Sequence, residues 1–95
     1  MKAVIRGKTY TIVLESLPRL NGSCDSPARA KPKITINPKL KNDKELLTVL
    51  IHEMLHACFW DMSEEAVKES ADSMANVLYR LGARIEFTEE DSKNS

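Results

Sequence analysis

Hydrophobic and polar residues alternate along the first part of the chain, a pattern typical of β-strands with one buried face. Within residues 2–14 the β signal comes from Val4 and Ile5 and then from Tyr10, Ile12 and Leu14, the last three at a spacing of two. Gly7-Lys8 lies between the two groups and predicts a turn. Residues 33–37 alternate in the same way and are followed by Pro38, which ends the pattern. These segments predict a β-hairpin and one further short strand.

Residues 17–32 carry no such period. They hold three of the four prolines of the chain, and also Gly22, so they predict a long irregular loop. Long loops in small domains are frequently functional. This loop leads directly into the strand predicted at residues 33–37.

Apolar residues three and four apart predict a helix from Asn42 or Asp43 to about Phe59. Either residue at its start can cap the helix, because both side chains accept hydrogen bonds from backbone N–H groups. The apolar positions cover a wide arc; they are Leu46, Leu47, Leu50, Ile51, Met54, Leu55 and Cys58. We therefore expect most of this helix to be buried.

A second helix is predicted over residues 64–81, with Asp61 or Ser63 as its cap and Gly82 at its C-terminal end. The connection to the first helix is only a few residues long, so the two helices should form an antiparallel hairpin. The positions expected to face the core are Val67, Ser70, Ala71, Met74, Val77, Leu78 and Leu81.

Beyond the second helix, Ile85 and Phe87 alternate and predict either a short strand or a segment that packs back on the core. Residues 88–95 are polar and predict a mobile tail. A chain of 95 residues is expected to bury one core, so residues 1–87 form a single predicted domain. Strands in its first half and helices in its second half place this domain in the α+β class.

The composition, 42% hydrophobic and 29% charged, is that of an ordinary globular protein. No apolar stretch in the sequence is long enough to cross a bilayer. The N-terminal residues reach Arg6 before an apolar core of signal-peptide length has developed. A cytoplasmic location is therefore expected, and with it free thiols at Cys24 and Cys58, which form no CxxC pair.

The formal net charge is zero, but the charges are unevenly placed along the chain. Residues 1–42 hold nine Lys and Arg against two Asp and Glu, whereas residues 43–95 hold five against twelve. A basic front half can contact nucleic acid or an acidic partner. Here the basic residues are scattered among turns and alternate strand positions, without interleaved aromatic residues, which argues against nucleic acid as a partner.

The sequence His52-Glu53-Met54-Leu55-His56 lies inside the first predicted helix and contains the only two histidines of the chain. Histidines four apart project from one helix face, one turn apart, so both imidazoles can bind one zinc ion. Glu53 is about 100° further round the helix, where its carboxylate can reach water on the metal without having to bind the metal. The spacing predicts a zinc site with His52 and His56 as ligands and Glu53 as general base.

The expected chemistry is peptide hydrolysis. Zinc lowers the pKa of its water to about 7, Glu53 takes the proton, and the resulting hydroxide attacks a carbonyl polarised by the metal. Glu53 can then pass the proton to the leaving amine, and Tyr10 and Tyr79 are candidates to stabilise the oxyanion. The competing interpretation is that both histidines are partly buried side chains satisfied by hydrogen bonds, with Glu53 solvated. Polar residues on an otherwise buried helix need partners, and a metal supplies them.

A catalytic zinc has three protein ligands and one open position, and with no further histidine the third ligand must be a carboxylate or a cysteine. The carboxylate candidates are Asp61, Glu64, Glu65, Glu69 and Asp72. Glu64 is favoured because it flanks the stripe that faces the first helix, with Glu65 next. Glu64 can instead serve a capping box that starts at Asp61, and Cys58 is more consistent with a core thiol.

Residues 47–58, followed by residues 63–67, resemble the small phage and bacterial gluzincin-like metallopeptidases, the SprT-like or ImmA-like group. The likeness covers about residues 20–82; it includes Gly22-Ser23-Cys24-Asp25, Ile34-Thr35-Ile36 and residues 78–82. It implies a minimal zincin core, that is, a small antiparallel sheet of about three strands packed against two helices, and zinc held by the histidine pair and a glutamate of the second helix. It also implies a phage origin, and a peptide-binding edge at the strand before the active-site helix, here residues 33–37.

Three functions are compatible with these features. The first is a zinc peptidase acting on a protein or peptide substrate. The second is a non-catalytic adaptor or regulatory module stabilised by zinc, which predicts a closed four-ligand site including Cys58 or Asp61. The third is a nucleic-acid-binding phage protein that uses the basic front half. It predicts salt-sensitive retention on DNA that is lost when Arg29, Lys31 and Lys33 are neutralised.

Overall fold

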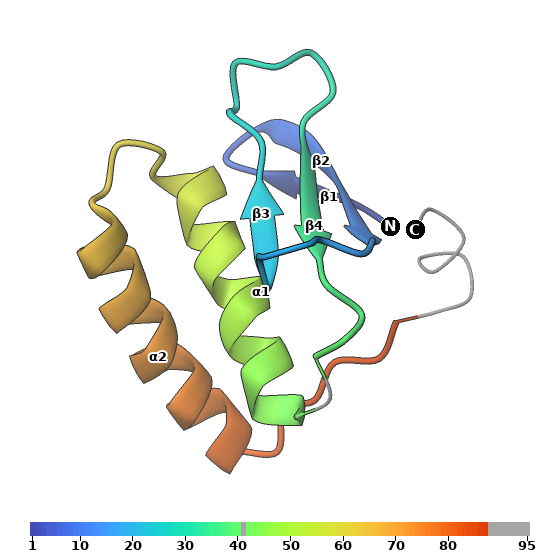
Figure 1. Ribbon diagram of the computed structural model, residues 1–95. Coiled ribbons are helices and arrows are strands. Elements are labelled where there is room, and N and C mark those ends of the chain that lie inside the picture. Colours follow the sequence, from blue (N-terminus) through green and yellow to red (C-terminus); the bar gives the residue numbers. More distant parts are fainter. Residues whose placement is uncertain (41, 88–95) are drawn as a thin grey trace.

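The computed structural model describes residues 1–40 and 42–87, and the tail predicted at residues 88–95 lies outside them. Within the described residues the elements in chain order are β1 (Lys2–Ile5), β2 (Lys8–Leu14), β3 (Gly22–Cys24), β4 (Lys33–Ile36), α1 (Asp43–Cys58) and α2 (Glu64–Arg80). One sheet and two helices make up the domain, which confirms the α+β class (Figure 1).

The sheet has the strand order β1-β2-β4-β3. The outer pairs, β1 with β2 and β3 with β4, are antiparallel, whereas β2 and β4 are parallel. The expectation of an antiparallel sheet of about three strands is therefore wrong in strand number and in the direction of the central pair. Side-chain alternation reports which face of a strand is buried and carries no information about strand direction. The long connection between β2 and β4 carries the chain back so that both strands run the same way (Figure 1).

The hairpin of β1 and β2 turns at Arg6-Gly7, one residue earlier than predicted, because Ile5 pairs with Lys8. Both turn residues have positive φ, 49° for Arg6 and 79° for Gly7. Positive φ at both central positions is the geometry of the two-residue type I′ turn, whose twist suits a hairpin. Glycine accepts that conformation without steric cost at the second position.

The segment predicted as an irregular loop contains β3, which pairs with β4 through the register Ser23 to Thr35. This pairing places β4 in the interior of the sheet and leaves β3 with a free edge. The implied peptide-binding edge at residues 33–37 is therefore wrong, since both sides of β4 are already occupied. The edge strand beside α1 is β3 instead (Figure 1).

Helix α1 lies between the sheet and α2, so it is covered on both sides (Figure 1). Asn42 caps its start by accepting hydrogen bonds from the backbone N–H groups of Lys44 and Glu45, at 2.9 and 3.1 Å. The core between α1 and the sheet is built mainly by alternate strand residues; it contains Ile5, Tyr10, Ile12, Leu14, Ile34, Ile36 and Ala57. Burial of Tyr10, Ile12 and Leu14 in β2 is confirmed, but Val13 between them is buried as well, so the end of this strand does not alternate.

Helix α2 is capped by Ser63, whose side chain accepts a hydrogen bond from the N–H of Ala66 at 3.1 Å. Gly82, with φ of 97°, follows its C-terminal end as predicted. Its contact with α1 uses small residues four apart, Val67 and Ala71, followed by Ala75, all fully buried.

Much of the predicted core stripe of α2 is wrong. Four of its members are between 41% and 78% exposed; they are Met74, Val77, Leu78 and Leu81. The reason is that among the described elements α2 packs against α1 and not against the sheet, so only a narrow line of its surface is covered. Three of them, Met74, Val77 and Leu78, border an apolar groove of about 600 Å³, whose other wall includes Ile51 and Met54 of α1.

Residues 83–87 form no regular structure, so the short strand considered for Ile85 and Phe87 is absent from the described residues. Phe87 packs against the core, which agrees with the alternative that this segment packs back. In the part of the chain that the structure describes, neither helix has the length and apolar character needed to cross a membrane.

Candidate metal centre

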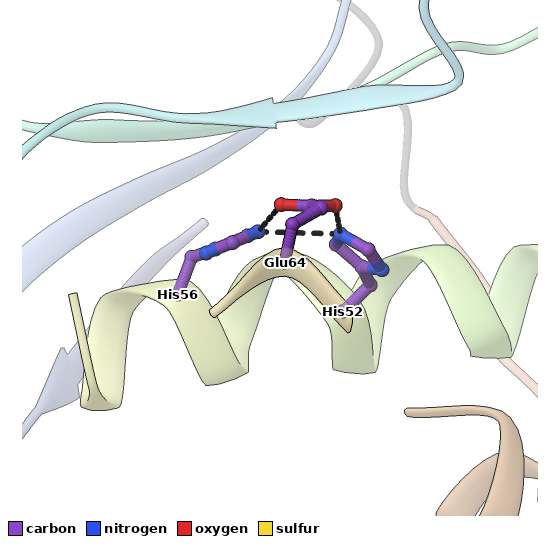
Figure 2. Close-up of side chains that lie close together, drawn as sticks. All are labelled: His52, His56 and Glu64. Carbon is purple, nitrogen blue, oxygen red and sulfur yellow. Dashed lines mark hydrogen bonds and ion pairs between the residues drawn. The ribbon is translucent and has the colours of Figure 1, made fainter. Parts of the chain in front are cut away.

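Three side chains from the two helices converge at the end of the helical hairpin (Figure 2). The Nε2 atoms of His52 and His56 lie 3.2 Å apart. Each also lies beside one carboxylate oxygen of Glu64, at 2.7 Å from Oε1 for His52 and at 2.9 Å from Oε2 for His56. The structure therefore brings together the two histidines and the glutamate that the sequence favoured as the third ligand.

The donor set is of a kind that can hold a zinc ion. Two imidazole nitrogens and one carboxylate are a common ligand set of catalytic zinc. Ligand atoms 2.0–2.1 Å from a tetrahedral ion lie about 3.3 Å from one another. The two Nε2 atoms are 3.2 Å apart, whereas the Glu64 oxygens lie closer to them, at 2.7 and 2.9 Å, so the carboxylate would move outward to admit an ion. The ring planes of His52 and His56 are inclined at 61°, so the two nitrogens approach the same point from different directions.

Local structure explains why Glu64 faces the histidines. Because Ser63 is the cap, Glu64 is the first residue of α2 and not the third residue of a capping box that starts at Asp61. Its side chain points across to α1 (Figure 2). The short connection between the helices places the start of α2 beside His56, near the end of α1. The third donor thus depends on the geometry of the helical hairpin.

Glu53 is only 7% exposed, although it neighbours a ligand candidate in the sequence. With His52 and Glu64 it lines a hollow of about 240 Å³. Burial raises the pKa of Glu53 to about 7; His52 opposes this rise and the Glu64 carboxylate adds to it. A carboxylate whose pKa lies near neutrality can accept and then release a proton at neutral pH. The interpretation of Glu53 as a solvated side chain is wrong.

The other carboxylate candidates do not join this group of donors. Among the described residues, the cluster that can hold a metal consists of His52, His56 and Glu64. Glu65 and Glu69 are exposed on α2, and Asp72 forms an ion pair with Lys68 of the same helix, at 3.2 Å. Asp61 lines a separate hollow beyond the end of α1. Cys58 is half-buried against the core, as expected of a core thiol.

The two tyrosines considered for oxyanion stabilisation lie away from the donors. Tyr10 is fully buried in the core, and within the described part of the chain its hydroxyl has no hydrogen-bond partner. Tyr79 is near the C-terminal end of α2, under the guanidinium of Arg84 at 4.0 Å, whereas Glu64 begins that helix. Neither tyrosine lines the hollow beside Glu53.

The sequence pattern did not identify the residues that form the walls of this hollow as part of a site. Leu20, Asn21 and Gly22 come from β3 and the residues before it, and Thr48 and Val49 come from the turn of α1 before His52. The helical period carries a signal for Thr48, which lies four residues before His52 on the same face. The approach of β3 depends on the long-range pairing with β4, for which the sequence has no local signal.

On the other side of the histidine pair, the ring of Trp60 lies 6.4 Å from that of His56, centroid to centroid. Trp60 is 45% exposed and follows the end of α1. An exposed indole is suited to contact an apolar group. It stands beside the histidine pair, within reach of a molecule bound there.

In comparisons with known proteins, no family model, no curated protein and no solved structure matches this chain. The likeness to the gluzincin-like peptidases therefore stays an expectation from the sequence motif.

Proposed function

We propose that this protein is a zinc-dependent peptidase in which His52, His56 and Glu64 hold the metal. Glu53 is its general base. The observation that carries the proposal is the convergence of three donor groups within 2.7–3.2 Å, next to a buried carboxylate that lines the same hollow. The residues His52 to His56 supply the helical spacing that this chemistry requires.

Zinc at these donors would supply a Lewis acid that polarises a peptide carbonyl and acidifies water. Glu53 accepts the proton of the attacking water at its carboxylate. It then donates that proton to the amine nitrogen of the breaking peptide bond, so the carboxylate is regenerated and one water is consumed. In the metal-free protein the pKa of Glu53 is about 7, so neither protonation state is strongly favoured at pH 7 before zinc binds.

The free edge of β3 offers backbone groups for an extended peptide. The backbone oxygen of Asn21 accepts a hydrogen bond from Asn37, and the backbone N–H of Asp25 donates one to Lys33. The backbone groups of the odd-numbered residues in this segment therefore face β4. Alternate residues of an antiparallel pair direct their N–H and C=O groups to opposite sides, and those of Gly22 therefore face the free edge. A peptide added there would run past Glu53, which favours a protein or peptide substrate.

Two observations weigh against the alternative functions. A structural zinc site is closed by four protein ligands, whereas the donor group in the described residues has three members and includes neither Cys58 nor Asp61. For nucleic-acid binding, two of the three basic residues expected to contact DNA form ion pairs with carboxylates of the same chain. Arg29 pairs with Asp25 at 3.5 Å, and Lys33 pairs with Glu15 at 3.3 Å.

The test is the zinc content and peptidase activity of the purified protein, with a quenched fluorescent peptide library as substrate. We expect Glu53→Gln to bind zinc as the parent does and to lose at least about a hundredfold in kcat/KM, because only the proton acceptor is removed. The matched control is Glu45→Gln, an exposed glutamate in the first turn of α1. It should leave both the zinc content and kcat/KM unchanged.

His56→Ala should reduce zinc affinity as well as activity, because it removes one of the donor atoms. Full peptidase activity in Glu53→Gln would overturn the role of Glu53. A parent protein that binds zinc but cleaves no peptide in the library would favour the adaptor function instead.

A further inference from the structure

Gly22 lies where β3 crosses α1, and there is no room for a side chain at this point. A Cβ atom at residue 22 would lie 2.7 Å from Cγ1 of Val49, and 3.1 Å from Oε2 of Glu53. It would also lie 3.1 Å from the backbone oxygen of Thr35. The first distance is shorter than any real carbon contact, and the other two are tight. The strand therefore lies directly against the carboxylate.

The three neighbours differ in how far they can move. The oxygen of Thr35 belongs to the backbone of β4, which is held on both sides by β2 and β3. The methyl group of Val49 is on a β-branched residue inside a helix, where one χ1 rotamer is strongly preferred. The carboxylate of Glu53 is the end of a flexible side chain. Moving Glu53 alone would leave the 2.7 Å contact with Val49 in place, so a side chain at residue 22 would lift β3 away from α1 and release the Glu53 carboxylate from its place against the strand.

We propose that Gly22 is a positioning residue, whose missing side chain lets β3 hold the Glu53 carboxylate beside His52 and Glu64. This role deepens the proposed peptidase function and rests on it. The donors of the metal centre come from α1 and α2 only. Displacement of β3 or of the Glu53 carboxylate therefore leaves the three donors in place. A substitution at Gly22 should move the general base without changing metal binding.

The test is Gly22→Ala, assayed for zinc content, for kcat and KM, and for the position of Glu53 in a crystal structure of the zinc-loaded protein. We expect zinc content equal to that of the parent, a displaced Glu53 carboxylate, and kcat lower by about a hundredfold. A misplacement of about 1 Å in a reacting group has an effect of that size. The substitution keeps the backbone N–H and C=O of residue 22 but moves the strand that carries them, so we expect the fall in kcat to exceed any rise in KM.

Gly7→Ala is the matched control for the loss of a glycine. Gly7 has φ of 79° and no atom within 4 Å of its would-be Cβ, and it lies in the β1–β2 turn, so alanine there strains the backbone without touching the site. We expect it to lower the unfolding midpoint and to leave kcat unchanged. A loss of kcat in Gly22→Ala alone then comes from the site and not from general destabilisation.

A double-mutant cycle with Val49→Ala tests the steric cause, because this change removes the atom closest to the would-be Cβ. The effect of Gly22→Ala on kcat should be several-fold smaller in the Val49→Ala background than in the parent. If Gly22→Ala does not fold, the double variant is compared directly with Val49→Ala by the same measurements.

An unchanged kcat in Gly22→Ala, or loss of zinc together with activity, would overturn the positioning role. If the parent hydrolyses no peptide, the proposed function fails on its own. The crystal structure then still decides about Gly22. A displaced Glu53 beside intact donors supports the positioning role, and an unmoved carboxylate contradicts it.

Discussion

At the scale of single residues, the environment of Glu53 determines what this side chain can do. Glutamates elsewhere on the helices, such as Glu45 and Glu65, are exposed. The side chain of Glu53, in contrast, is buried where α1 packs against β3. Enclosure disfavours the charged carboxylate because water no longer solvates it. The same residue type therefore has a different proton affinity at this one position.

This burial makes the stability of the metal-free protein depend on pH. The pKa of Glu53 is about 7 in the folded state, against an ordinary value of 4.5. Between these values the folded protein holds a proton that the unfolded chain has released, so the stabilising contribution is complete below about pH 4.5 and is lost as the pH rises through 7. We expect the free energy of unfolding to fall by up to about 3 kcal/mol over this window.

Urea unfolding of chelator-treated protein at pH 5 and pH 8 measures this effect. In Glu53→Gln the side chain does not titrate, so the decrease between the two pH values should be smaller than in the parent by that amount. The two proteins differ only at residue 53, so the difference between their decreases is assigned to this side chain. Equal decreases in the parent and the variant would show that Glu53 is not desolvated in the fold.

At the scale of elements, the start of α2 connects helix capping to the candidate metal centre. Ser63 accepts a hydrogen bond from Ala66 and thereby fixes the first turn, where Glu64 is the first residue. The carboxylate of Glu64 reaches both histidines only while this turn is formed. A side chain that has no contact with the metal centre thus supports it.

Ser63→Ala should lower the free energy of unfolding by about 1 kcal/mol, as expected for loss of a helix cap. It should also weaken zinc binding several-fold, because the turn that carries Glu64 frays. Ser73→Ala, an exposed serine further along α2, is the control: it should leave zinc affinity unchanged and raise the free energy of unfolding by about 0.5 kcal/mol, because alanine has the higher helix propensity. The measurements are urea unfolding and zinc titration by calorimetry. If Ser63→Ala binds zinc as tightly as the parent, the helix cap does not contribute to zinc binding.

At the scale of the whole molecule, the donors join two helices, of which only α1 packs on the sheet. A bound ion would therefore tie the outer helix to the rest of the domain. Zinc at about a hundred times its Kd should stabilise the fold by about 2.7 kcal/mol. For a domain of this length that amounts to a rise in Tm of roughly 10 °C or more.

Glu64→Gln should lose most of this rise, whereas Glu65→Gln, which changes the adjacent exposed glutamate, should keep it. Both substitutions remove one acidic charge from the first turn of α2, so the pair separates the ligand from the helix dipole. Thermal unfolding with zinc and with chelator gives the two values of Tm for each protein. The reverse result, loss of the rise in Glu65→Gln alone, would assign the third ligand to Glu65.

The sequence predicted the features that depend on residues close together in the chain. Side chains four apart on a helix meet on one face, so the His52 and His56 pair followed from the helical period. The bounds of α1 and α2 followed from caps and from Gly82. Three of the buried positions of β2, Tyr10, Ile12 and Leu14, followed from their spacing of two. The favoured third donor, Glu64, needed the additional assumption that the two helices form a hairpin, and the observed geometry agrees with it.

Long-range pairing decided the remaining features. Strand direction, the interior position of β4 and the presence of β3 depend on which backbones meet across the sheet, and hydrophobic spacing does not encode these contacts. For the same reason the exposed apolar face of α2 was misjudged, because the pattern shows that residues are apolar without showing whether another element covers them.

By itself, the sequence determined the chemistry within reach of one helix, that is, two imidazoles and a carboxylate at helical spacing. Only the tertiary structure decided that Glu64 completes the donor group and that Glu53 is enclosed by an edge strand at Gly22. The physical reason is distance along the chain. Helical geometry acts over four residues, whereas enclosure of Glu53 requires a strand 31 positions away to pair with β4 and lie against α1.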